Sequence, residues 1–155
     1  MKISIVEVFE APVERVFDVL TDVEHAADRV SGIEKIEILS EVRSGLGLRW
    51  RETRVMFGKE ATEVMDVTAY ERPMLWRTEA RSHGMHYVTE LSLKAVDANT
   101  TEVTQTFSGT ALSLGAKLMT PLAMLAVGPT RKDLRKDLLE GKAVVDEEEC
   151  KKGDW

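Results

Sequence analysis

The chain has 155 residues, with 27 acidic and 21 basic side chains and a formal net charge of −6. A length of this order suits one domain that buries a hydrophobic core without disulfides or metals. The balance is acidic and the charges are spread along the chain. Because phosphate binding needs a basic patch, this argues against a nucleic-acid partner.

The first part of the chain predicts a strand followed by two short helices. Residues 2–10 are rich in Ile and Val, and Pro12 suits the first position of a helix. Apolar residues then recur at the spacing of one helical face, at Val13, Val16, Phe17 and Leu20. Asp22 is placed to cap a second helix over residues 23–29, which the Ser31-Gly32 pair ends.

The middle of the chain predicts six more strands, because β-branched and aromatic residues alternate with polar residues between turn signals. We expect these strands at residues 33–39, 48–57, 60–70, 74–82, 85–96 and 101–111. Neighbouring side chains of a strand point to opposite faces. In the last three strands one face therefore carries the large apolar and aromatic residues, among them Trp76, Tyr87 and Phe107.

The strand over residues 48–57 has a less clear pattern, because both of its faces mix charged and apolar residues. The face that we assign inward has the largest apolar members and consists of Leu48, Trp50, Glu52, Arg54 and Met56. Glu52 and Arg54 then enter the interior together, where unpaired charges are costly. They are expected to form a structural ion pair or to meet a polar ligand, and Glu52 is a weak candidate for a general base. The alternative is that both point outward.

Residues 114–140 predict the one long helix available to cover this sheet. Four side chains of its apolar first half are expected either to line a cavity or to fill the core: Met119, Leu122, Met124 and Leu125. Pro121 and Gly128-Pro129 interrupt the helical pattern. They predict either a kink that lets the helix move as a gate, or a helix that begins only at Thr120 after an irregular lead-in.

Four segments carry a family resemblance: IVEVFEAPVERVFDVLTDVE (5–24), GLGLRWRET (45–53), YERPMLWRTEA (70–80) and DLRKDLLEGK (133–142). In this order they resemble the START-like superfamily (SRPBCC) with the helix-grip fold, over roughly residues 3–145. The chain looks most like the polyketide cyclase/dehydrase and lipid-transport group. The resemblance implies an α+β fold, in which a curved seven-stranded antiparallel sheet wraps around the long C-terminal helix, with two short helices between the first two strands.

The resemblance also implies a cavity between sheet and helix that takes a small apolar or amphipathic molecule. The expected ligand-binding residues are Trp50, Glu52, Arg54, Trp76, Tyr87, Phe107, Met119 and Leu122. The first functional hypothesis is a small-molecule binding or transport protein. The second is an enzyme of the polyketide cyclase/dehydrase type, in which Glu52, a tyrosine or a histidine transfers protons. The third is a protein-interaction module, which needs an exposed apolar patch or a surface for self-association.

No strong catalytic or metal-binding motif is present in the sequence, and we expect neither a cofactor nor a metal. His83 and His86 flank a turn and offer two imidazoles, but a zinc site needs at least three protein ligands. A solvated turn is therefore the preferred interpretation, with a metal site at the two histidines as the alternative.

The lone cysteine, Cys150, lies in a polar segment and is expected to be a surface thiol. We assign residues 1–145 to one domain and residues 146–155 to a disordered polar tail. The chain lacks a signal-peptide pattern, and its most apolar run, 118–129, is shorter than the ~20 residues that cross a bilayer. We expect a cytoplasmic protein without stable membrane insertion, a description that is compatible with a homo-oligomer.

Overall fold

The computed structural model describes residues 1–56 and 58–153. Its centre is a seven-stranded antiparallel sheet with the strand order β1-β7-β6-β5-β4-β3-β2. The strands are β1 (Lys2–Phe9), β2 (Ile33–Ile38), β3 (Arg49–Met56), β4 (Lys59–Glu71), β5 (Leu75–Ser82), β6 (Met85–Asp97) and β7 (Thr100–Ala111). Phe57, expected at the end of the third strand, lies outside the described residues.

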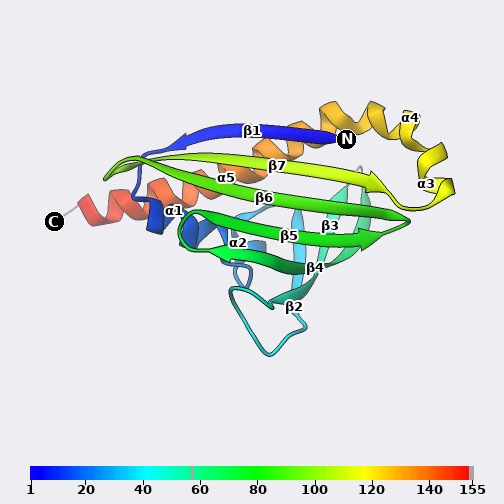
Figure 1. The fold of residues 1–155 in the computed structure, drawn as a ribbon. Helices are drawn as coiled ribbons and strands as arrows, with labels where there is room; N and C mark the ends of the chain where they lie inside the picture. Colours follow the sequence, from blue (N-terminus) through cyan, green and yellow to red (C-terminus); the bar gives the residue numbers. More distant parts are fainter. Residues whose placement is uncertain (57, 154–155) are drawn as a thin grey trace.

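Helices cover one side of this sheet. They are α1 (Val13–Leu20), α2 (Ala26–Arg29), α3 (Leu114–Leu118), α4 (Thr120–Ala123), the 3₁₀ turn η1 (Met124–Ala126) and α5 (Val127–Gly153). Figure 1 shows α5 running along the curved sheet, with α1 and α2 nearby and with α3 and α4 beyond the end of β7. The predicted helix-grip fold, including the two short helices between β1 and β2, is confirmed.

The first strand completes the sheet by pairing with the last one. Ile3 lies opposite Phe107 and Val8 lies opposite Glu102 in the antiparallel β1–β7 register. Along β1 the buried residues are Ile3, Ile5 and Phe9, and the residues between them are mostly exposed. This alternation, which the sequence predicts for a strand with one solvated face, directs the inward side chains towards α5.

The hydrophobic core lies where α1 and the second half of α5 pack on the sheet. Phe9, Phe17, Val103 and Val145 are fully buried. The Phe17 ring also meets Tyr70 edge to face, with ring centroids 5.4 Å apart. All four residues of the predicted apolar face of α1 are buried, namely Val13, Val16, Phe17 and Leu20. The other part of the space between α5 and the sheet is left for the cavity described below.

One buried polar contact ties β7 to the connection between β1 and α1. The Thr101 hydroxyl donates to the carbonyl oxygen of Ala11 at 2.8 Å, and both residues are fully buried. Replacing Thr101 by Val is expected to lower the free energy of unfolding by about 1–3 kcal/mol, because the Ala11 carbonyl loses its donor. Chemical denaturation measures the loss, with Thr104→Val on the outer face of the same strand as the control. Equal losses in the two variants would contradict this role of Thr101.

The second predicted helix is shorter in the structure. It spans Ala26–Arg29 rather than residues 23–29, and no side chain caps it. The Asp22 carboxylate, which we expected to cap this helix, instead lies 2.8 Å from Nδ1 of His25. The first residues of the predicted helix therefore form a turn.

Residues 114–140 do not form one continuous helix. The chain passes through α3, α4 and η1 before the long helix α5 begins at Val127. Pro121 lies in the first turn of α4 and Pro129 in the first turn of α5, where a missing N–H breaks no helical hydrogen bond. The alternative of an irregular lead-in thus describes the segment better than a kinked helix, although the long helix begins later than Thr120.

Helix α5 continues through residues 146–153, which belong to the range 146–155 that we assigned to a disordered tail. Arg15 of α1 pairs there with Glu148 and with Glu149, and Lys151 pairs with Glu147 one turn earlier at 3.2 Å. These contacts support the last turns of the helix. Trp155 lies outside the described residues. Within residues 1–56 and 58–153, no helix combines the length and the apolar character that crossing a membrane requires.

Candidate functional site

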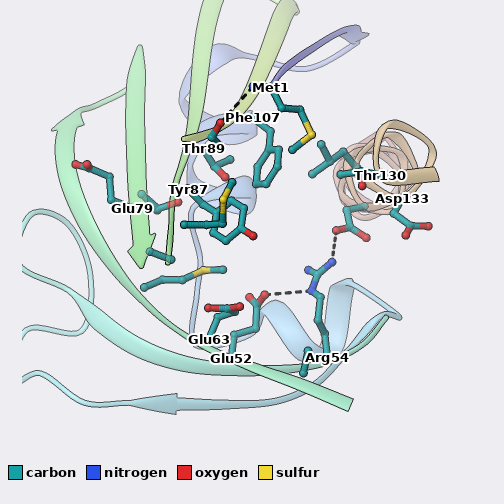
Figure 2. A pocket seen from close by; sticks show the side chains of 18 of the residues that line it. Met1, Glu52, Arg54, Glu63, Glu79, Tyr87, Thr89, Phe107, Thr130 and Asp133 are labelled. Atoms are coloured by element: carbon teal, nitrogen blue, oxygen red, sulfur yellow. Dashed lines mark hydrogen bonds and ion pairs between the residues drawn. The ribbon is translucent and has the colours of Figure 1, made fainter. Parts of the chain in front are cut away.

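A cavity of about 1120 Å³ lies between the concave face of the sheet and the helical segments (Figure 2). Seven of the eight predicted ligand-binding residues line it: Trp50, Glu52, Arg54, Trp76, Tyr87, Phe107 and Met119. Leu122 is not among the lining residues, and its side chain is 59% exposed. The inward phase that we assigned to residues 50, 52 and 54 of β3 is thus the observed one, while the part of these residues in ligand binding stays a prediction.

Four aromatic rings form two stacked pairs on the cavity wall. The centroids of Trp50 and Trp76 are 6.2 Å apart with an interplanar angle of 11°, and those of Tyr87 and Phe107 are 5.7 Å apart with an angle of 17°. Gly109 lies opposite Tyr87 in the β6–β7 register, and a Cβ there would come within 3.3 Å of the tyrosine ring. The glycine therefore leaves room for Tyr87. Together the rings provide broad apolar surfaces for a ligand.

The main polar feature of the cavity is a triad that joins β3 to α5. Nε of Arg54 donates to Oε2 of Glu52 at 3.1 Å, and Nη1 of Arg54 donates to Oδ2 of Asp137 at 2.9 Å (Figure 2). The side chains of Glu52, Arg54 and Asp137 are only 10%, 23% and 19% exposed. The structure thus pairs Glu52 with Arg54, as one of our alternatives predicted, and adds Asp137 as a second anionic partner.

Burial determines how the triad titrates. It raises the pKa of the Glu52 carboxyl above its ordinary value, although Arg54 opposes this change. Burial also raises the pKa of Asp137, again against the effect of Arg54. Burial disfavours the charge on Arg54, but the two carboxylates outweigh it and the pKa of Arg54 rises. The triad therefore holds a permanent cation between two carboxyl groups that release their protons less readily than surface acids do.

This titration predicts a pH-dependent difference between the protein and its Glu52→Gln variant. A carboxyl with a raised folded pKa stabilises the fold below its unfolded pKa, near 4.5 for Glu52, and loses that contribution as pH rises through the folded pKa. From about pH 4 to neutral pH, the protein should therefore lose stability relative to Glu52→Gln, by about 1.4 kcal/mol for each pH unit that separates the folded pKa from the unfolded pKa. Urea denaturation across this range measures the difference. A difference that does not change with pH would contradict the prediction.

Two more carboxylates lie on the cavity wall. Glu63 of β4 stands directly opposite Glu52 in the β3–β4 register, and Asp133 projects from α5. In the part of the chain that the structure describes, neither of them forms an ion pair. Glu79 also borders the cavity, but His86 Nε2 donates to its carboxylate at 2.8 Å beside a separate pocket on the outer face of the sheet.

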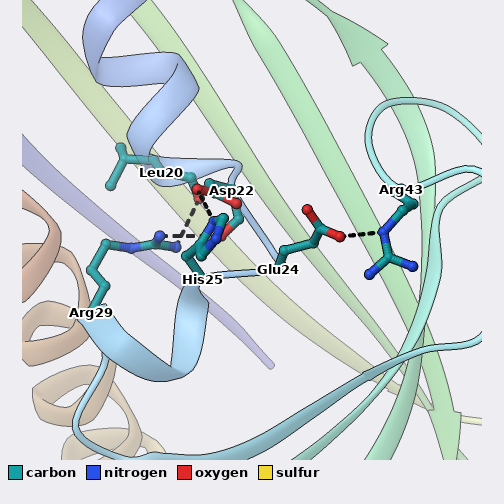
Figure 3. Close-up of polar contacts among 6 residues, drawn as sticks. All are labelled: Leu20, Asp22, Glu24, His25, Arg29 and Arg43. Carbon is teal, nitrogen blue, oxygen red and sulfur yellow. Dashed lines mark hydrogen bonds and ion pairs between the residues drawn. The ribbon is translucent and has the colours of Figure 1, made fainter.

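Arg29 lines the cavity, and Figure 3 shows its guanidinium directed towards Leu20 and Asp22. Its guanidinium donates to the backbone carbonyl oxygens of Leu20 at 3.5 Å and of Asp22 at 3.2 Å, and so satisfies the C-terminal end of α1. Burial lowers the pKa of Arg29. Close by, Glu24 pairs with Arg43 and ties the loop after β2 to the connection between α1 and α2. Both arginines of the cavity wall thus direct their donors at protein groups.

The segment between β7 and α5 divides its apolar side chains between cavity and solvent. All four are mostly exposed, but Met119 and Met124 also line the cavity, whereas Leu122 and Leu125 do not. In one continuous helix Met119 and Leu122 would share a face, but Met119 lies at the junction of α3 and α4. Five leucines between β7 and α5 are mostly exposed, namely Leu112, Leu114, Leu118, Leu122 and Leu125.

The two histidines of the β5–β6 turn do not converge on one point. His83 has a φ of 51°, and its Nδ1 lies 2.7 Å from the Ser82 hydroxyl, whereas His86 bonds Glu79. Among residues 1–56 and 58–153, no group of three or more His, Cys, Asp or Glu side chains is arranged to hold a metal ion. Cys150 is an exposed free thiol on α5.

Residues 1–143 match the family described as "Polyketide cyclase / dehydrase and lipid transport". The chain belongs to this family. The match runs from β1 into the second half of α5, so both walls of the cavity lie within it. No curated protein matches the chain significantly in sequence.

Solved structures share the fold of this family member at low sequence identity. The Zhui aromatase/cyclase from Streptomyces sp. R1128 is 20% identical, with a TM-score of 0.74 over 94% of this chain and 93% of that protein. TTHA0849 from Thermus thermophilus is 17% identical, with a TM-score of 0.73 over 94% and 97%. A START superfamily protein from Mycobacterium smegmatis is 15% identical, with a TM-score of 0.72 over 94% and 97%. At these identities the likeness shows the fold alone.

Several charged residues of the site did not stand out in the sequence, among them Asp137, Glu63 and Arg29. Asp137 had a signal, because it lies three residues after Leu134 and so borders the apolar face of α5. Glu63 had a weaker one, because strand alternation places it on the same face as Met65. Arg29 had none, since its place follows from how α2 packs beside the end of α1.

Proposed function

We propose that this protein binds a small apolar or amphipathic molecule in the cavity between the sheet and α5. The observation that carries the proposal is the cavity. Its volume of about 1120 Å³ is large enough for a small molecule, since ordinary ligand pockets measure roughly 300–1,000 Å³. Its stacked aromatic rings offer apolar surface, and the buried triad supplies the few polar groups that orient a ligand. The chain's membership in a family described by cyclases and lipid transport supports the same function.

A cavity-filling variant tests this proposal. Ala80 is buried on the cavity wall, between Met65 and Tyr87 in the sheet register, and Ala80→Phe would occupy that space. Apolar and amphipathic molecules that raise the melting temperature of the protein should lose this effect in Ala80→Phe. The matched control is Val64→Phe, on the outer face of the sheet, which should keep the ligand response.

Native mass spectrometry of the purified protein gives an independent test. A retained molecule that is released on denaturation would support the proposal. A broad panel of ligands without any thermal shift, together with native masses that equal the bare chain, would contradict it.

The buried carboxyl of Glu52 favours a second candidate, an enzyme of the cyclase or dehydrase type. Burial raises the pKa of this carboxyl, so it holds a proton more readily than a surface carboxyl and can act as a general acid or base. Tyr87, whose phenol pKa burial also raises, lines the same cavity. A reaction that moves protons on a hydrophobic substrate, such as an aldol cyclisation or a loss of water, would use these groups.

Glu52→Gln separates the two candidates. For an enzyme, it should lower turnover of a polyketide-like substrate by about 10²-fold or more while the ligand still raises the melting temperature. For a binding protein without catalysis, ligand binding would persist in both forms and neither would convert the ligand. Unchanged turnover in Glu52→Gln would exclude this role of the carboxyl.

A further inference from the structure

The charged groups of the cavity wall are unevenly balanced. Five carboxylates line the cavity, those of Glu52, Glu63, Glu79, Asp133 and Asp137, against the two guanidinium groups of Arg29 and Arg54 and the terminal ammonium group of Met1, an excess of two acidic groups. Glu79 accepts a hydrogen bond from His86, and the Met1 ammonium donates to the carbonyl oxygen of Gly109. Arg54 is bound on both sides by Glu52 and Asp137, and Arg29 donates to backbone carbonyls. The arginines are therefore already engaged, and the unmatched groups of the cavity are acidic.

The register of β3 and β4 places two of these carboxylates side by side. Glu52 and Glu63 are directly opposite each other in the antiparallel pair. Directly opposite residues have Cβ atoms roughly 4.5–5.5 Å apart, and like charges at such positions repel each other. Arg54 contacts Glu52 but not Glu63 in the described residues. A cation placed next to Glu63 would relieve this repulsion.

Aromatic rings border the same carboxylates. Trp50 precedes Glu52 by two residues on the inward face of β3, and it stacks on Trp76. Tyr87 lies close enough to Glu63 for that carboxylate to influence its phenol. Aromatic faces attract ammonium groups, tryptophan most strongly, and they do so better where water is scarce. Carboxylates and aromatic rings together form the usual protein environment of an organic cation.

From this arrangement we infer that the ligand of the cavity is a cationic amphipath, whose protonated amine or quaternary ammonium group lies between Glu63 and the aromatic rings. This inference rests on the proposed binding function and adds the charge of the ligand to it. The cavity supplies the site, and its unmatched carboxylates select the charge. The apolar part of the ligand would lie along the two stacked ring pairs.

Three naphthalene probes of similar shape test the charge of the ligand. Naphthylethylamine is cationic at neutral pH, naphthylethanol is neutral and naphthylacetate is anionic. Isothermal titration calorimetry with the full chain should show the amine bound about tenfold more tightly than the alcohol, a difference of about 1.4 kcal/mol, with the carboxylate weakest. High salt should reduce the difference in affinity between the amine and the alcohol, because salt screens the charge of the carboxylates.

Two matched variants test the role of Glu63 in selecting a cation. Glu63→Gln should weaken amine binding by about fivefold to tenfold and leave alcohol binding unchanged, because it removes charge but little volume. Asp66→Asn removes the same charge from the same strand on its outer face and should change the binding of none of the three probes. Melting temperatures of both variants verify that they are folded.

The outcomes separate this inference from the function on which it rests. Equal affinity for amine and alcohol, or an equal loss for both in Glu63→Gln, would overturn the cationic ligand while leaving a binding protein. Tightest binding of naphthylacetate would likewise overturn it. Binding of none of the probes in any variant would count against the cavity as a ligand site, and so against both proposals.

Discussion

Replacing Arg54 by Met is expected to lower the free energy of unfolding by about 3–5 kcal/mol at neutral pH, because two largely buried carboxylates lose the cation that they share. Glu52 and Asp137 come from β3 and from α5, so their repulsion would act between the sheet and the long helix. Because both carboxyls already have raised pKa values, they can take up protons when the cation is removed. The loss should therefore shrink towards pH 4, and urea denaturation at both pH values measures it.

Arg51→Met is the matched control for this experiment. Arg51 lies on the same strand but on its outer face, where it pairs with Glu37 at 2.8 Å, and its side chain is 45% exposed. Solvated ion pairs of this kind contribute little to stability, so the variant should unfold much like the parent protein. Equal stability of Arg54→Met and Arg51→Met would show that the triad does not hold α5 to the sheet.

The architecture was predictable because most of its elements show a clear strand or helix periodicity. Strand alternation from β5 to β7 and the helical spacing of α1 each put one apolar set on one face, and burial follows that set. Prediction failed where local chemistry decides between helix and turn. Pro121 and Pro129 were visible, but the sequence does not say whether a proline kinks a helix or begins one.

The site was predictable in part. The inward face of β3 was predicted, but the cross-strand partner of Glu52 was not, because it depends on the turn between β3 and β4. We placed this turn at Gly58 and Lys59, which would put Met65 opposite Glu52. The observed register pairs Met56 with Lys59 and therefore puts Glu63 opposite Glu52. Strand alternation gives the face of a residue but not its partner, since the partner depends on the turn.

Contacts between distant elements were beyond the sequence for the same reason. Arg54 and Asp137 are 83 residues apart, and their hydrogen bond depends on the angle at which α5 crosses the sheet. The sequence required a partner for the inward charges of β3 but did not say which of the carboxylates on α5 it would be. The burial of charged residues thus predicts that an ion-pair network exists, but which residues form it depends on how α5 packs on the sheet.

Leu138→Ala should destabilise the protein by about 2–5 kcal/mol, whereas Leu122→Ala should change its stability by about 0.5 kcal/mol or less. Leu138 is 3% exposed on α5 and belongs to the core, while Leu122 is 59% exposed on α4. Both substitutions remove the same atoms from the apolar pattern that predicted one long helix over residues 114–140. Chemical denaturation of the two variants therefore measures which part of that pattern serves the core. Similar losses at both positions would mean that Leu122 packs against the rest of the protein in solution.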